Sequence, residues 1–137
     1  MTPTLFALTG FVAWSLALLV LMETIRSKMV MTGEVKANGF NPENSNLSPF
    51  MQRLARAHAN CVEGLPIFGG LMLIAVVAGQ SSVTDSLALV FLCARIVQSL
   101  IHLSSLSAIA VTLRFSAFAV QMAIAVYWAF GLLTAFS

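Results

Sequence analysis

Four long apolar stretches, separated by short polar segments, dominate the pattern of this chain. They cover residues 5–22, 54–78, 87–104 and 115–136. Each is close to the roughly 20 residues that an α-helix needs to cross a ~30 Å hydrocarbon core. We therefore predict an all-α integral membrane protein, a single four-helix bundle domain over residues 1–137. The expected spans are about 4–25, 49–78, 84–106 and 114–136, with a polar loop over 26–48.

The composition agrees with a membrane protein. Hydrophobic residues make up 59% of the chain and charged residues only 9%, whereas soluble domains average about 25% charged residues. The net charge is +2 at pH 7, and the charges lie near the ends of the spans. This charge is too small and too dispersed to indicate nucleic acid as a partner. The expected surroundings are the lipid bilayer.

The basic residues predict the orientation of the spans. Arg114 lies between the third and fourth spans, and the connection between the first two spans holds Arg26, Lys28, Lys36 and Arg53. Residues 79–85 and both ends of the chain contain no lysine or arginine. By the positive-inside rule, the 26–48 loop and the last connection are cytoplasmic and both termini lie on the opposite side. We expect a bacterial inner membrane, because no retention signal is recognisable in this compact chain.

Polar side chains inside the second span share one face of the helix. At 100° per residue, this face holds Arg53, Arg56, Asn60 and Glu63 within an arc of roughly 80°. A charge at the bilayer centre costs about 2.5–3.5 kcal/mol on insertion scales. This face is therefore expected to look into a protein interior, and its ionisable residues are candidates for function.

The third span carries a second polar face, made of Arg95, Gln98 and His102. The short turn at 79–85 makes the second and third spans antiparallel neighbours, so Glu63 and Arg95 lie at similar depth. An ion pair between them could simply lock the helices together. However, arginines outnumber carboxylates in the spans, which favours a small anionic ligand held between helices near the cytoplasm.

The two cysteines, Cys61 and Cys93, lie away from these polar faces. We expect both to be small buried hydrophobic residues rather than a disulfide or metal ligands. No metal site is predicted.

The second span resembles the helix-two signature of a known family. The run Arg56-Ala-His-Ala-Asn60-Cys-Val-Glu63-Gly-Leu-Pro66 is similar to R-x-x-x-N-x-x-E-x-x-P of the membrane-associated proteins in eicosanoid and glutathione metabolism (MAPEG). That family includes microsomal glutathione transferases, leukotriene synthase and microsomal prostaglandin E synthase. The resemblance extends to the four spans, the long first loop, Arg95 in the third span and Arg114 near the fourth.

The resemblance implies a homotrimer that binds glutathione between neighbouring subunits and acts on a lipophilic substrate. Arg114 would stabilise the glutathione thiolate and His102 would stand in for a catalytic tyrosine. The implied glutathione-binding set is Arg26 from the adjacent subunit together with Arg53, Arg56, Asn60, Glu63, Arg95 and Gln98. The expected reaction is conjugation of glutathione to an electrophile, or reduction of a lipid hydroperoxide.

Several tyrosines of the family synthases are replaced in this chain. Gly64 follows the helix-two glutamate, Gln98 and His102 replace tyrosines of the third span, and Phe118 replaces one in the fourth. The loss of these hydroxyls argues against a specific eicosanoid activity. Two alternatives stay open: a non-catalytic binding or scaffold protein of the same fold, and a small ion-coupled exporter. An exporter of that class would carry its membrane carboxylate in the first span, which here is uncharged until Glu23.

Overall fold

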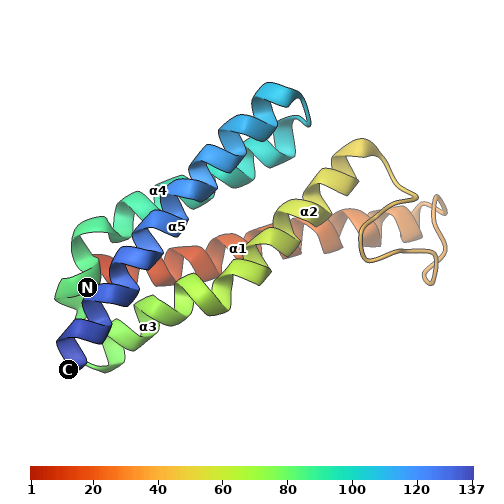
Figure 1. Cartoon of the computed structure of the whole chain (residues 1–137). Helices are drawn as coiled ribbons and strands as arrows, with labels where there is room; N and C mark the ends of the chain where they lie inside the picture. Colours follow the sequence, from red (N-terminus) through yellow and green to blue (C-terminus); the bar gives the residue numbers. More distant parts are fainter.

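The computed structural model describes all residues, 1–137, and is entirely helical (Figure 1). The helices are α1 (Pro3–Met31), α2 (Pro49–Gly64), a π-helical segment η1 (Leu65–Gly69), α3 (Gly70–Val77), α4 (Ser81–Ser104) and α5 (Ala108–Phe136). Because α2, η1 and α3 form one continuous span, four helices are long and apolar enough to cross a membrane. This confirms the predicted all-α membrane fold. Both termini lie at one end, opposite the loop between α1 and α2.

Helix α4 occupies the centre of the bundle. It packs against α1, α2, α3 and α5, whereas α5 packs chiefly on α4. At the end that holds the termini, α5 also contacts α3. Toward the loop end, the α4–α5 pair diverges from the α1–α2 pair (Figure 1). The bundle therefore has a tightly packed end and a more open end.

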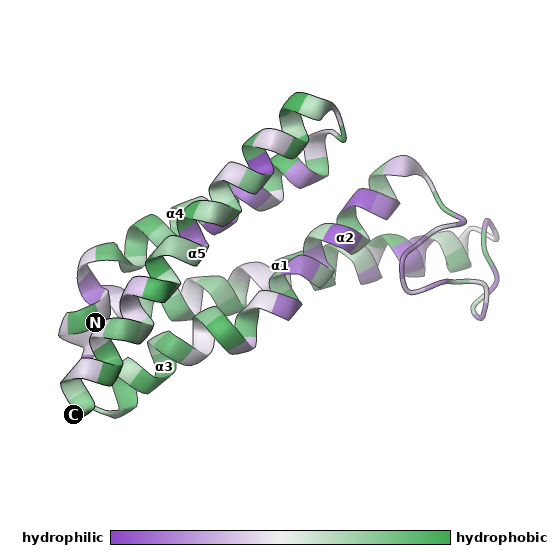
Figure 2. Ribbon diagram, in the orientation of Figure 1, coloured by the Kyte–Doolittle hydropathy of each residue, from purple (hydrophilic) through white to green (hydrophobic).

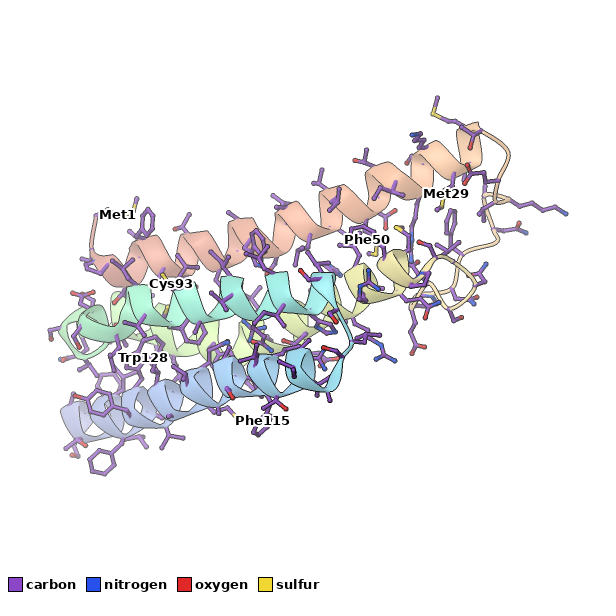
Figure 3. The ribbon with its side chains drawn as sticks, turned by 90° about the horizontal axis from the view of Figure 1, so that it is seen from above. Met1, Met29, Phe50, Cys93, Phe115 and Trp128 are labelled. Carbon is purple, nitrogen blue, oxygen red and sulfur yellow. The ribbon has the colours of Figure 1, made fainter.

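Aromatic rings form the core of the packed half. Phe91 of α4 lies 5.1 Å from Phe68, 5.5 Å from Trp128 and 5.7 Å from Phe11, measured between ring centroids. These rings come from four different segments, and Trp128 lies between α4 and α5 (Figure 3). Offset aromatic pairs at such distances stabilise a core beyond the area that they bury. One ring cluster thus holds all four spans together.

A polar clasp closes the same end of the bundle. The Asp85 carboxylate accepts hydrogen bonds from the Thr4 backbone N–H at 3.1 Å and from the Thr4 hydroxyl at 2.5 Å. The hydroxyls of Thr4 and Thr84 are 2.6 Å apart. Because Thr4 begins α1 and Asp85 lies near the start of α4, the clasp satisfies a free helix N–H and fixes two helix ends together.

The helix ends agree with the sequence in one place and differ in another. Ser48 caps α2 by accepting a hydrogen bond from the Met51 N–H, and Pro49 takes the first helical position, as serine followed by proline predicts. The last helix, however, begins at Ala108 rather than at 114, because Ser107 caps it by accepting from the Ala110 N–H. Arg114 therefore lies inside a helix and not at its entrance.

The π-helical segment follows from Pro66. Proline has no N–H to donate and its ring crowds the preceding turn, so the α-helical hydrogen-bond pattern is interrupted there. The helix continues through Leu65–Gly69 with π-type hydrogen bonding before α3 begins. This interruption lies directly after Glu63 and Gly64.

Candidate functional site

Arg95 lies at the centre of a polar network inside the bundle. Its side chain is fully buried, at 0% exposure, and its Nη1 donates a 2.6 Å hydrogen bond to Asn60 Oδ1. No carboxylate reaches it, because the single ion pair of the chain joins Arg26 to Glu23 at 3.2 Å. The ion pair considered between Glu63 and Arg95 is therefore not formed, since Glu63 points to the outside of α2.

Aromatic rings take the place of a counterion around Arg95. The guanidinium carbon lies 5.2 Å from the Phe11 ring centroid, 5.7 Å from that of Phe68 and 6.0 Å from that of Phe118. Desolvated cation–π contacts of this kind contribute about 2 kcal/mol or more. The Nε and Nη2 atoms have no hydrogen-bond partner. The cage of rings thus offsets part of the cost of burying the charge.

A chain of side-chain amides extends from Asn60 across the bundle. Gln98 Nε2 donates to Asn60 Oδ1 at 3.1 Å, and Gln121 Nε2 donates to Gln98 Oε1 at 2.7 Å. The chain links α2, α4 and α5. Gln121 is fully buried and was not among the predicted site residues. The available signal was a lone amide in an apolar stretch of the last span.

The predicted polar face of α2 is divided between the inside and the outside of the bundle. Asn60 turns toward Arg95, whereas Arg56 and Glu63 are exposed and make no hydrogen bond within the chain. The chain itself therefore covers only part of this face, the part that holds Asn60. The spacing placed the residues correctly on the helix, but one neighbouring helix is too narrow to cover the full arc.

Arg53 and Arg26 are engaged within the chain. Arg53 Nε donates to the Leu103 carbonyl at 2.8 Å, near the end of α4, where helix carbonyls lack internal partners. Arg26 donates from Nε to Asn44 Oδ1 at 3.1 Å and from Nη2 to the Asn41 carbonyl at 3.1 Å. The Arg53 contact joins α2 to α4, and the Arg26 contacts hold the loop against α1.

The loop and α2 form a groove beside Arg56. It has a volume of about 360 Å³ and is lined by Pro42, Glu43, Ser45, Gln52, Ala55, Arg56 and Ala59. Arg26 fixes the segment that supplies the loop side of this groove, because its partners Asn41 and Asn44 flank the lining residues.

His102 and Arg114 lie on α4 and α5 at the open end of the bundle. His102 is 7% exposed and its Nε2 has no hydrogen-bond partner. Arg114 Nη1 is likewise buried without a partner. Arg114 and Arg56 are both close enough for their charges to act on His102. Three helices thus bring basic groups together with two unpartnered buried polar atoms, an arrangement that suits an anion.

Figure 2 shows where these groups lie along the bundle. Hydrophilic positions run along α2 from the loop as far as its junction with the π-helical segment, whereas α3, which continues the same span, is hydrophobic. The candidate site therefore lies at the open end, bordered by apolar helix surface.

The two cysteines differ in their surroundings. Cys61 is buried, with its Sγ 3.4 Å from Ser99 Oγ and 3.9 Å from Arg95 Nη1. Cys93 is exposed on α4 (Figure 3), so the predicted burial is correct for Cys61 only. No group of three His, Cys, Asp or Glu side chains comes together to form a metal site.

Gly64 provides the space that Arg95 occupies. A Cβ at this buried glycine would lie 3.0 Å from Arg95 Nη2 and 3.0 Å from Phe68 Cδ2. Any side chain at this position would therefore press on the guanidinium and on the Phe68 ring. The glycine and the burial of Arg95 are two parts of one packing arrangement.

We predict that Gly64→Ala destabilises the protein by about 1–3 kcal/mol, because Arg95 and Phe68 are confined by the ring cage and cannot move aside freely. Gly70→Ala is the matched control, since a Cβ at Gly70 meets nothing within 4 Å. Unfolding in mixed detergent micelles measures both variants. Equal stability of the two would contradict the described packing.

Comparison with known proteins identifies the family. The sequence matches the MAPEG family over residues 4–134. No match was found among curated proteins or among solved structures. Because the match covers nearly the whole chain, this four-helix membrane protein belongs to the MAPEG family, which includes glutathione-dependent transferases and synthases.

Proposed function

We propose that the chain is a membrane-embedded enzyme that binds glutathione and stabilises its thiolate for reaction with a lipophilic substrate. Membership of the MAPEG family supports glutathione as the co-substrate. The observation that carries the proposal is the basic cluster of Arg56, His102 and Arg114, with two buried nitrogen atoms that lack partners. A thiolate, together with the carboxylates of glutathione, would supply the missing negative charge.

Arginine beside a thiol favours the reactive thiolate, and preorganised donors stabilise that charge at low cost in a dry site. In conjugation, the thiolate sulfur forms a carbon–sulfur bond with the electrophile, and the displaced electron pair leaves with a group such as chloride. In peroxide reduction, two glutathione molecules and one hydroperoxide yield glutathione disulfide, an alcohol and water. In both reactions we assign thiolate stabilisation to Arg114, with a hydrogen bond from His102.

The exposed charges of α2 suit the charged ends of glutathione. Arg56 matches a carboxylate through a bidentate guanidinium contact, and Glu63 matches the α-amino group. Asn60 lies between them on the helix and offers an amide. Arg53, Arg95, Gln98 and Arg26 are already bonded within the chain, so we propose that they shape the site rather than contact the ligand.

We further propose that copies of the chain cover this face as a homotrimer. From Glu63 to Val77 the span rises about 21 Å at 1.5 Å per residue, which places Glu63 within a ~30 Å hydrocarbon core. An exposed carboxylate at that depth would otherwise face lipid at a cost of about 2.5–3.5 kcal/mol. A neighbouring subunit removes this cost and completes a ligand site between subunits.

Native mass spectrometry of the protein released from detergent tests the assembly. We expect three copies of the chain. Replacing both Glu63 and Arg56 by leucine is not expected to dissociate the trimer, because apolar side chains still fit a protein interface. A wild-type protein that is monomeric at all micromolar concentrations would contradict the trimer.

A non-catalytic glutathione-binding protein is the second candidate. It is favoured by one observation: Gln98, at a position where family synthases carry a tyrosine, has both its amide oxygen and nitrogen engaged within the chain. Glutathione binding without turnover across a panel of electrophiles and hydroperoxides would support this candidate.

For the enzyme, we predict that Arg114→Ala lowers kcat/KM by about 100-fold or more with glutathione and 1-chloro-2,4-dinitrobenzene, as loss of one charge-stabilising donor typically does. Glutathione affinity is expected to fall less than tenfold, because the other charged groups remain. Lys36→Ala, which removes a basic residue from the loop, is the control. Unchanged turnover in Arg114→Ala would refute the role of this arginine.

A further inference from the structure

We propose that Arg95 is a positioning residue that sets the direction of the amide chain and makes Asn60 present its NH₂ group, as a hydrogen-bond donor, to the ligand. The group that binds at Asn60 is then an oxygen acceptor, a carbonyl or a carboxylate. This inference rests on the proposed function for the identity of the ligand. The direction of the amide chain can be tested without the ligand.

The first step is the contact between Arg95 and Asn60. A guanidinium has five N–H donors and no acceptor. The Asn60 side-chain atom that lies 2.6 Å from Arg95 Nη1 must therefore be its oxygen, Oδ1. Elsewhere the two ends of an amide are hard to tell apart, but a neighbour that can only donate fixes the orientation.

The second step carries this orientation across the bundle. Gln98 also reaches Asn60 Oδ1, at 3.1 Å, and an oxygen that only accepts requires the Gln98 atom to be Nε2. The Gln98 oxygen then faces Gln121, which must donate from its own Nε2 at 2.7 Å. The same Nε2 also donates to the Ala117 carbonyl at 3.1 Å. Arg95 thus orients Asn60 and, through it, Gln98, and the Ala117 carbonyl holds Gln121 in the matching orientation.

The unpartnered oxygen of Gln121 agrees with this direction. Gln121 is fully buried, and its Oε1 has no hydrogen-bond partner. The Ala117 carbonyl can only accept, so it also requires Nε2 on that side of Gln121. The direction set at Arg95 and the direction set at Ala117 therefore agree along the amide chain.

The third step concerns the outward side of Asn60. Its Oδ1 accepts two hydrogen bonds, which fills both lone pairs. Its Nδ2 makes no hydrogen bond within the chain and is not among the buried unpartnered atoms. The NH₂ group is therefore accessible, on the helix face between Arg56 and Glu63. It can donate to an oxygen but cannot accept from an ammonium or amide N–H.

Arg95 is well placed for this role because it cannot relax. It is fully buried among the rings of Phe11, Phe68 and Phe118. Gly64 lies directly beside it, since a Cβ added there would come 3.0 Å from Nη2. A donor fixed this firmly holds Asn60 in one orientation before the ligand arrives, which reduces the ordering cost of binding.

The test compares Asn60→Asp with wild type by calorimetric titration of glutathione. Aspartate keeps two oxygens for Arg95 and Gln98, so the variant is expected to fold with at least wild-type thermal stability. The outward NH₂ group is replaced by a carboxylate oxygen, which can only accept. The Kd for glutathione is therefore expected to rise tenfold or more. Wild-type affinity in this variant would overturn the proposal.

A double-mutant cycle separates positioning from a general structural effect. Arg95→Met is expected to weaken glutathione binding when Asn60 is present and to add nothing in the Asn60→Ala background. Arg95→Lys, which keeps a donor, should recover part of the affinity. Additive losses in the cycle would overturn the positioning role.

Side-chain amide hydrogen exchange, followed by nitrogen NMR, tests the direction without any ligand. We expect fast exchange for Asn60 Nδ2 and slow exchange for Gln98 and Gln121 Nε2. Slow exchange at Asn60 in the unliganded protein would overturn the proposal, even if glutathione binds. If the wild type does not bind glutathione, the proposed function is overturned. The exchange pattern still decides the direction of the amide chain in that case.

Discussion

The structure depends on the burial of one positive charge, that of Arg95, without a carboxylate. Its guanidinium is enclosed by Phe11, Phe68 and Phe118 and bonded to Asn60. These residues come from α1, η1, α5 and α2, so every span contributes to the surroundings of a residue on α4. Moving any of these helices would leave the charge without its rings or its acceptor. The contacts that offset the cost of burying the charge therefore also constrain how the helices pack.

This constraint separates two halves of the bundle. In one half, aromatic rings and the Asp85–Thr4 clasp hold the helices together. In the other, the amide chain connects the interior to the outward face of α2, where charged side chains have no partner within the chain. The polar groups that a ligand would need are consequently concentrated at the open end, beside apolar surface from which a lipophilic substrate would arrive.

The sequence predicted the features that depend on local patterns. The number of spans and the Ser48-Pro49 cap follow from local patterns, and both are confirmed. The start of α5 was missed because Ser107 caps it without any glycine or proline nearby. Helical periodicity placed Asn60 and Glu63 on one face, but it could not say where α4 covers that face and where it stops. The ring cage around Arg95 was also beyond prediction, since Phe11 and Phe118 are distant in sequence and look like ordinary apolar residues.

The most direct test of the proposed function is whether the folded protein binds glutathione as a thiolate. Titration of the detergent-purified wild type, followed by the ultraviolet absorbance of the thiolate, measures this, with S-methylglutathione as the control that cannot ionise. We predict a saturable increase in absorbance at millimolar glutathione or below, and none with the methylated compound. A folded protein that gives no such signal would contradict the proposed function and would leave the polar network with a role in helix packing alone.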